Sequence, residues 1–255
     1  MNRVYVIAAN TFREAVRDRV LNSILFFAVI LLCLSLTLKE MSIGDTAKVV
    51  RGVALGGTSL LAAVIAIFLG VGLVYKEIEK KTIYTLASKP LPRWHLLLGK
   101  YLGLWITLAA EVGLLTLFYT LVLATQQGLP SLGVYLAMVL LMAELSLLTA
   151  WATLFSTFAT PMTASAFSVC IYLIGHFADD LRLFAERAED GPFKTMLSIL
   201  YRVVPNLESF NIRDEAVHGV PVPWSEVLWS GAYGLGYSAA VLAVAMIIFE
   251  RRDFK

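Results

Sequence analysis

The sequence predicts an all-α, polytopic membrane protein with six transmembrane helices. Apolar residues make up 58% of the 255 residues and charged residues only 16%, whereas a soluble domain carries about a quarter charged residues. The apolar residues are also collected into runs of 17 or more, instead of the amphipathic stripes of a soluble bundle. We therefore assign residues 1–255 to a single transmembrane domain and exclude an ordinary soluble enzyme fold.

Residues 1–19 are predicted to form an interfacial helix. Polar and apolar side chains fall on opposite faces, with a net charge of +2 for residues 2–19 that favours a surface of anionic lipid headgroups. The polar face holds Arg3, Asn10, Arg13, Glu14 and Arg17, and the apolar face holds Val4, Ala8, Phe12, Ala15 and Val16. The following apolar run is too long for a signal-peptide core and lacks a small-residue cleavage site, so we expect the amino terminus to be retained.

Six segments are long and apolar enough to cross a bilayer. At about 1.5 Å per residue, even the shortest approaches the roughly 30 Å hydrocarbon core. An even number returns the chain to its starting side, so both termini should share one side. The expected spans are residues 20–38, 53–75, 101–124, 132–158, 162–178 and 227–249.

The charges orient these spans. Residues 75–103 hold six basic and two acidic residues, and the end segment 251–255 has a net charge of +2. Because basic loops stay in the cytoplasm, both termini and residues 76–100 should be cytoplasmic, in a multi-pass protein of the inner membrane. The alternation of spans then places residues 39–52 and 179–226 outside.

The external segment 179–226 is expected to be helical. Apolar spacing predicts short helices over residues 181–188 and 193–204, separated by the breaker pair Gly191-Pro192. We expect these two helices to cap the outer mouth of the bundle, between the fifth and sixth spans.

The cytoplasmic segment 76–100 carries the most specific pattern in the chain. Residues 77–87 alternate charged and apolar side chains, which suits a short helix lying flat on the membrane, and Pro90 and Pro92 then force an elbow. The pattern Glu-x-Glu-x-x-Thr, Leu-x-Ser-x-Pro-x-x-Arg, Leu-Gly-Lys-x-x-Gly is present as Glu77, Glu79 and Thr82, then Leu86, Ser88, Pro90 and Arg93, then Leu98, Gly99, Lys100 and Gly103.

This pattern resembles the coupling segment of type-2 ABC exporter permeases, although Lys81 stands where those proteins often have glycine. Residues 206–211 and 248–254 resemble the same family. The resemblance implies a permease subunit that docks onto a separate ATPase subunit and pairs with a second permease copy, identical or related. Glu77 and Glu79 would engage the ATPase surface, and Ile78, Ile83 and Leu86 would fill its cleft. Thr82, Ser88, Pro90 and Arg93 complete the implied coupling segment.

No catalytic or cofactor site is expected in the chain itself. Gly99-Lys100 is not a phosphate-binding loop, because that loop needs a glycine where Trp94 stands and a Ser or Thr where Tyr101 stands. The common metalloprotease and serine-hydrolase motifs are absent as well. ATP and Mg²⁺ would therefore bind to the partner ATPase, and the expected surroundings are lipid bilayer and protein, without nucleic acid.

Two acidic residues are predicted to be buried in the membrane. Glu111 and Glu144 fall near the middles of the third and fourth spans, where a charge costs at least about 2.5 kcal/mol. Each could be a neutral, hydrogen-bonded structural group, or the two could line the substrate path or relay protons. The second interpretation supports an alternative function, a proton-coupled secondary transporter; a membrane enzyme of unrecognised type is a third.

Other polar and small residues receive structural interpretations. His176, Asp179 and Asp180 cluster at the expected outer end of the fifth span and favour a polar helix terminus over a metal site. Glycine pairs four residues apart typically allow close helix contact in membranes. Such contacts are expected at Gly52 and Gly56, at Gly99 and Gly103, and around Gly231, Gly234 and Gly236.

Overall fold

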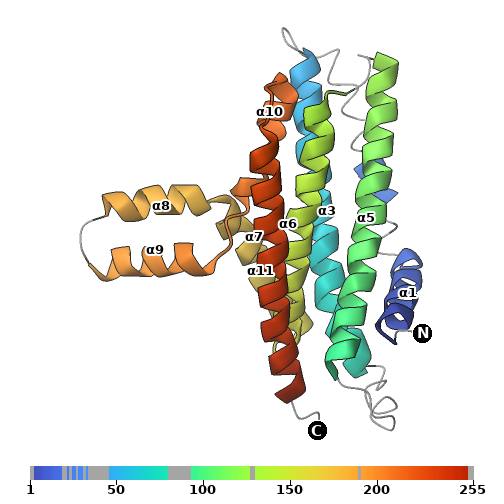
Figure 1. Ribbon diagram of the computed structural model, residues 1–255, viewed down its shortest axis with the longest axis vertical. Coiled ribbons are helices and arrows are strands. Elements are labelled where there is room, and N and C mark those ends of the chain that lie inside the picture. Colours follow the sequence, from blue (N-terminus) through green and yellow to red (C-terminus); the bar gives the residue numbers. More distant parts are fainter. Residues whose placement is uncertain are drawn as a thin grey trace.

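Four long helices run side by side along the molecule (Figure 1). The computed structural model describes residues 3–18, 22, 25–26, 28–30, 33, 46–79, 93–126, 130–188 and 191–251, and these contain helices but no strands. The four membrane-crossing helices match the expected spans 53–75, 101–124, 132–158 and 227–249. They are α3 (Thr46–Glu79), α5 (Arg93–Gln126), α6 (Leu132–Ser156) and α11 (Trp224–Arg251).

The predicted first span, residues 20–38, falls mostly outside the described residues. Its described positions, among them Asn22, Ala28 and Cys33, are helical, and Ala28 is buried in the core. A crossing at residues 20–38 stays a prediction.

Helix α6 is the centre of the bundle. It packs against α3, α5, α7, α10 and α11, and Leu145, Leu147 and Leu148 are fully buried. A helix that is apolar on every side has no face suited to water and is stable only when it is surrounded. Lipid would surround such a helix equally well, so the central position of α6 follows from its packing against five other helices and not from its composition alone.

The fifth span differs from the expected straight helix over residues 162–178. Helix α7 (Pro161–His176) is capped by Thr160, whose hydroxyl accepts a hydrogen bond from the backbone amide of Thr163, and it has proline in its first turn. Sixteen residues rise only about 24 Å, less than the roughly 30 Å hydrocarbon core. The chain then bends by 65° into α8 (Ala178–Arg187), so α7 alone is too short to cross a bilayer.

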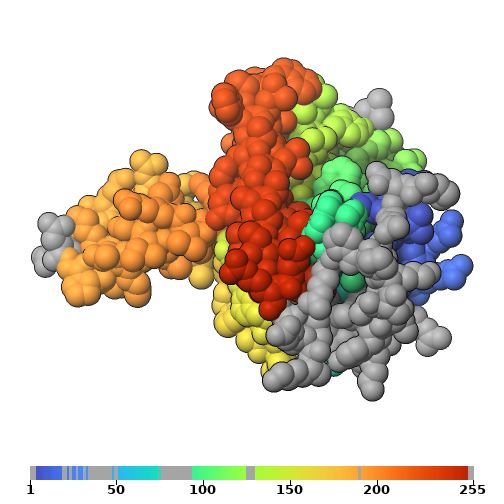
Figure 2. Space-filling view, turned by 60° about the horizontal axis from the view of Figure 1, so that its bottom comes forward, coloured from blue at the N-terminus to red at the C-terminus, as the bar shows by residue number. Residues whose placement is uncertain are grey.

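Helices α8 and α9 (Pro192–Val203) match the two short helices expected in the external segment. They pack against each other but project to the side of the bundle (Figures 1 and 2). The tyrosines of α11 attach their base, since Tyr237 donates to the carbonyl of Val203 at 2.7 Å and the amide of Asn206 donates to Tyr233 at 3.1 Å. The expectation that these helices cap the outer mouth is therefore wrong.

A short connection leads from α9 back into the bundle. It contains the 3-10 turn η1 (Glu208–Phe210) and the helix α10 (Arg213–His218), which lies at the end of the bundle where α11 begins (Figure 1). Gly219 ends α10 with a φ of 71°, a left-handed conformation that glycine adopts without strain. This connection positions Arg213 for the site described below.

Candidate functional site

The expected coupling segment joins the two longest helices at one end of the bundle (Figure 1). Glu77, Ile78 and Glu79 are the last residues of α3, and Arg93 is the first residue of α5. Residues 77–79, which begin the predicted flat helix 77–87, are thus the end of α3. The residues between, including Thr82, Ile83, Leu86, Ser88 and Pro90, lie outside the described part of the chain, so their roles stay predictions.

Helices α3 and α5 are longer than a bilayer requires. Each has 34 residues and rises about 51 Å, against a hydrocarbon core of roughly 30 Å. The membrane-crossing part of α3 ends at Leu73, so the helix continues past it to Glu79. A displacement applied at Glu79 or Arg93 would be carried into the membrane by unbroken helices.

The amino-terminal helix α1 (Arg3–Val16) lies against the first turns of α5 (Figure 1). A Cβ atom added at Gly103 would stand 2.6 Å from the carbonyl oxygen of Ala8 and 2.7 Å from the Cβ of Thr11. At Gly99 it would stand 2.8 Å from the Cβ of Ile7. The close contact predicted for this glycine pair is confirmed, and its partner is α1.

This contact also corrects the predicted apolar face of α1. Ala8 and Ala15 are buried as expected, but Thr11 is buried too, whereas 46% of the Val16 side chain is exposed. Thr11 satisfies its hydroxyl within the helix by donating to the carbonyl of Ile7 at 3.0 Å. A threonine can therefore face the glycines of α5 without leaving an unpaired polar group.

Lys100 is buried where α1, α3 and α5 meet, with only 7% of its surface exposed. It lines a small cavity with Thr11 and Glu14 of α1 and with Gly72 of α3. The lysine of the Leu-Gly-Lys pattern thus belongs to the junction of three helices. It is the last residue of the expected coupling segment 76–100, so the end of that segment packs against α1.

The other glycines predicted to allow close helix contact differ in what surrounds them. Gly234 faces Phe210 and Ala143, and an added Cβ would stand 2.9 Å from the nearest ring atom. Gly52, Gly56, Gly231 and Gly236 have no such neighbour within 4 Å. The close contacts expected at these four positions are not made by the described residues of this chain.

Glu144 on α6 is the more deeply buried of the two predicted acids. It is 2% exposed, and its Oε1 lies 3.6 Å from Nε2 of His176, the last residue of α7. His176 Nδ1 lies 3.1 Å from the carbonyl oxygen of Tyr172, a contact that requires a proton on Nδ1. Because α7 is short, His176 lies beside the middle of α6, not at the outer end of a full span as expected.

Arg213, at the start of α10, completes this site and was missed by the sequence reasoning. One of its terminal nitrogens lies 3.5 Å from His176 Nε2, and the other donates to the hydroxyl of Ser59 on α3. Its Nε donates to Asn211 Oδ1 at 2.7 Å. The guanidinium also interacts electrostatically with Glu144. We refer to Ser59, Glu144, His176, Glu208, Asn211 and Arg213 as the Glu144–Arg213 cluster.

The cluster joins four separate parts of the fold. Asn211 donates to Glu208 Oε1 at 2.7 Å, which links the loop after α9 to the arginine. Asp179 was expected to group with His176. Instead, its Oδ1 accepts a hydrogen bond from the side-chain Nδ2 of Asn206 at 3.0 Å. The cluster therefore holds α3, α6, the end of α7 and the start of α10 together through one cation and two acids.

Glu111 on α5 is buried, with 6% of its surface exposed, but has a different environment. Neither of its carboxyl oxygens has a hydrogen-bond partner among the described residues. No ion pair or hydrogen bond links it to Glu144 within the described ranges. The role of Glu111 and Glu144 in transport stays a prediction.

Comparison with known families identifies the class of protein. The family model described as ABC-2 family transporter protein matches residues 5–254, which is nearly the whole chain. The chain belongs to the ABC-2 transporter family. A search of curated proteins found no match. Family membership confirms the resemblance that the coupling segment suggested.

The ABC-2 permease is thus a multi-pass membrane protein that forms the transport subunit rather than a catalytic one. Members of this family generally work with an ATPase subunit. That assignment does not favour a proton-coupled transporter. Among the described residues, no group of three metal-ligating side chains is present.

Proposed function

We propose that this ABC-2 permease is the membrane subunit of an ATP-driven exporter and couples to a separate ATPase through residues 76–100. The match to the ABC-2 family over residues 5–254 carries the proposal. The geometry supports it, because the motif residues Glu77, Glu79 and Arg93 lie at the ends of the two helices that exceed the bilayer. In this orientation both termini and the coupling segment lie on the cytoplasmic side of the inner membrane.

The coupling works through continuous helices. ATP and Mg²⁺ bind to the partner subunits, and closure of two ATPases moves the coupling segment of each permease copy. The movement passes into α3 through Glu79 and into α5 through Arg93, and α1 follows α5 because of the tight contact at Gly103. Two permease copies enclose the pathway, and ATP shifts the balance between inward-open and outward-open arrangements.

The docking chemistry divides the coupling segment into two kinds of contact. Ile78, Ile83 and Leu86 provide buried apolar anchors, and Glu77 and Glu79 provide charge pairs that fix the direction of approach. Pro90 and Pro92 stiffen the elbow before α5 and so reduce the slack between docking and movement.

The experiment is a double charge reversal, Glu77→Lys with Glu79→Lys, in permease co-expressed with its ATPase. Loss of a partly desolvated charge pair costs about 2 kcal/mol or more, roughly thirtyfold in affinity. We expect pull-down of the ATPase and permease-dependent ATP hydrolysis to fall together, while membrane insertion is retained.

The matched control reverses two exposed acids far from the coupling segment, Asp180→Lys with Asp214→Lys. It changes the net charge by the same amount and should leave pull-down unchanged. Wild-type pull-down and wild-type hydrolysis in the Glu77→Lys/Glu79→Lys protein would contradict the proposed docking.

A further inference from the structure

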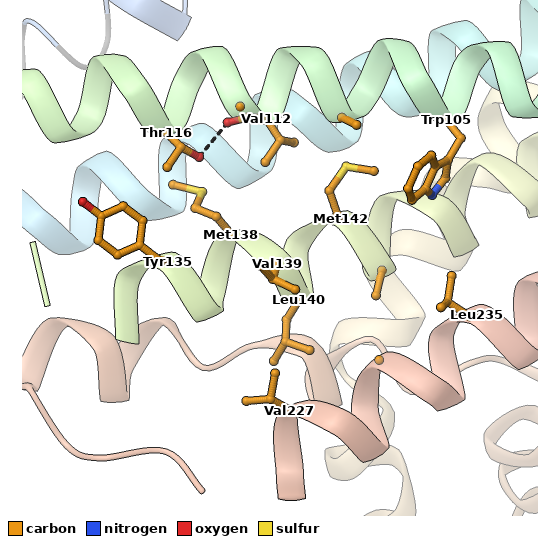
Figure 3. A pocket seen from close by; sticks show the side chains of 14 residues that line it. Trp105, Val112, Thr116, Tyr135, Met138, Val139, Leu140, Met142, Val227 and Leu235 are labelled. Carbon is orange, nitrogen blue, oxygen red and sulfur yellow. Dashed lines mark hydrogen bonds between the residues drawn. The ribbon is translucent and has the colours of Figure 1, made fainter. Parts of the chain in front are cut away.

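An apolar groove of about 570 Å³ lies between α5, α6 and α11 (Figure 3). Trp105 of α5 stands at one end, and Tyr135 of α6 stands at the other, with Met138 and Met142 between them. This volume falls within the roughly 300–1,000 Å³ of small-molecule sites. The groove is separate from both the coupling segment and the Glu144–Arg213 cluster.

The lining of the groove has no charge and no unused hydroxyl group. None of its fourteen lining residues is acidic or basic. The Thr116 hydroxyl donates to the carbonyl of Val112 at 2.6 Å, and the Tyr135 hydroxyl lies 3.4 Å from that of Thr120. The flexible thioethers of Met138 and Met142 can adjust to an irregular apolar shape. Apart from the indole N–H of Trp105 at one end, these walls suit a hydrocarbon chain better than a charged or strongly polar ligand.

Two glycines keep the groove open. Gly113 on α5 and Gly231 on α11 both line it, and a Cβ atom added to either would have no neighbour within 4 Å. At the rim, 60% of Val139 and 56% of Leu235 is exposed. Because α5, α6 and α11 are long and apolar enough to cross a membrane, we expect this rim to face hydrocarbon and not water.

The groove has the length of one leaflet. From Trp105 to Thr116 the helix α5 rises about 16 Å, close to half of the roughly 30 Å hydrocarbon core. Tyr135 lies near the start of α6 and Val227 near the start of α11, at the end of the bundle that carries α10 (Figure 1). The groove therefore extends inward from that face of the membrane.

We propose that this groove binds one acyl chain of a bilayer phospholipid from the leaflet on the α10 side. A lipid chain is long, flexible and apolar, and it is present in the medium that the rim faces. Binding needs only that the glycines leave the space vacant, so the site does not depend on coupling to ATP.

The experiment uses photo-crosslinking in vesicles of phosphatidylethanolamine and phosphatidylglycerol that contain a phosphatidylcholine with a diazirine in its acyl chain. Peptide mapping after irradiation should find the label concentrated around Val139 and Leu235, compared with the exposed Leu121 of α5, which does not line the groove. Gly231→Leu places a side chain in the groove and should reduce that label about tenfold, as should Val139→Trp at the rim.

Gly236→Leu is the matched control, because Gly236 is also open on α11 but lies outside the groove. It should label like the wild type. Val139→Trp makes the test independent of any folding defect caused by Gly231→Leu. Label unchanged in both groove variants, or no richer at Val139 than at Leu121, would overturn the proposal. A disulfide between two Val139→Cys copies in the membrane would also overturn it, since a second permease would then fill the groove.

Discussion

Arg213 explains how Glu144 can be accommodated inside a bundle of apolar helices. A buried carboxylate without a partner costs several kcal/mol, whereas a cation with additional hydrogen bonds offsets much of that cost. Arg213 is held by Ser59 and Asn211 and interacts with Glu144 across His176. The interaction brings together residues that are far apart in the sequence.

We expect Arg213→Met to destabilise the permease by roughly 2–3 kcal/mol, less than a fully buried pair because the arginine is half-buried. The combined variant Arg213→Met/Glu144→Gln should recover part of the loss, since no unpaired charge remains. Thermal unfolding in mild detergent measures both effects. Arg182→Met, which removes a fully exposed pair with Glu186, is the control and should melt like the wild type. Equal melting of the Arg213 and Arg182 variants would contradict a structural role for the cluster.

Replacing Glu111 should not destabilise the permease, in contrast to replacing Arg213. Its buried carboxyl oxygens have no partner among the described residues, and an unsatisfied buried polar group costs about 1–3 kcal/mol. Glu111→Met should therefore melt at the same temperature as the wild type or higher. If the acid is only structural, Glu111→Gln should also keep most transport in vesicles. Lost transport with normal assembly would instead place Glu111 on the substrate path.

The sequence predicted that both acids are buried but could not identify their partners. Burial follows from position within an apolar run, which is a local property. The contact of Glu144 with His176 depends on where α7 ends, and the contact with Arg213 depends on the return of the chain after α9. Neither is encoded in local spacing, so the sequence gives no reason to single out Arg213.

At the scale of elements, the apolar runs were enough to predict four of the long helices. The bend beside the middle of α6 was not predicted, because Asp179 and Asp180 favour a polar terminus at the outer end of a full span. Tertiary contacts explain it: the amide of Leu207 donates to the carbonyl of Gly175 at 2.9 Å. A Cβ at Gly175 would stand 2.6 Å from the Leu207 side chain. The loop after α9 thus occupies the space into which α7 would continue.

The packing of α1 on α5 can be tested with one methyl group. Gly103→Ala should weaken the contact by about 1–3 kcal/mol, because the added carbon would meet the backbone oxygen of Ala8 and the Cβ of Thr11, and neither atom can move unless the backbone of α1 moves. We expect a lower melting temperature and faster proteolysis within residues 3–16. Gly236→Ala adds the same methyl group in open space and serves as the control. Proteolysis at the same rate in both variants would contradict the close packing.

The molecule as a whole has two unlike ends. One end holds the terminus of α3 and the beginning of α5, with α1 beside it, and the other end holds α10 and the beginning of α11 (Figure 1). Exposed Trp224 and Trp229 lie near the α10 end, where aromatic residues are typical of a membrane interface. Arg13 of α1, Arg93 of α5 and Arg251 of α11 lie toward the opposite end, whereas Lys48 and Arg51 lie at the start of α3 on the α10 side. We propose that the coupling segment faces the cytoplasm, because residues 75–103 hold six basic residues against two acidic ones.

The orientation can be measured by cysteine labelling in a Cys33→Ala/Cys170→Ala background. Single cysteines replace Lys80 in the coupling segment, Arg187 at the end of α8, and Asp214 on α10. A membrane-impermeant maleimide added to intact cells should label positions 187 and 214 but not position 80, because basic segments stay in the cytoplasm.

Permeabilised cells provide the control, since position 80 should then react as well. Arg187 and Asp214 are both exposed, but they test different parts of the orientation. Asp214 reports the α10 end of the bundle, and Arg187 reports the arm formed by α8 and α9, whose base is attached to Tyr233 and Tyr237 within α11. Label at 214 without label at 187 would keep the orientation and show that the arm is covered by lipid or by a second copy. Label at 80 alone would reverse the orientation and remove the coupling segment from the reach of a cytoplasmic ATPase.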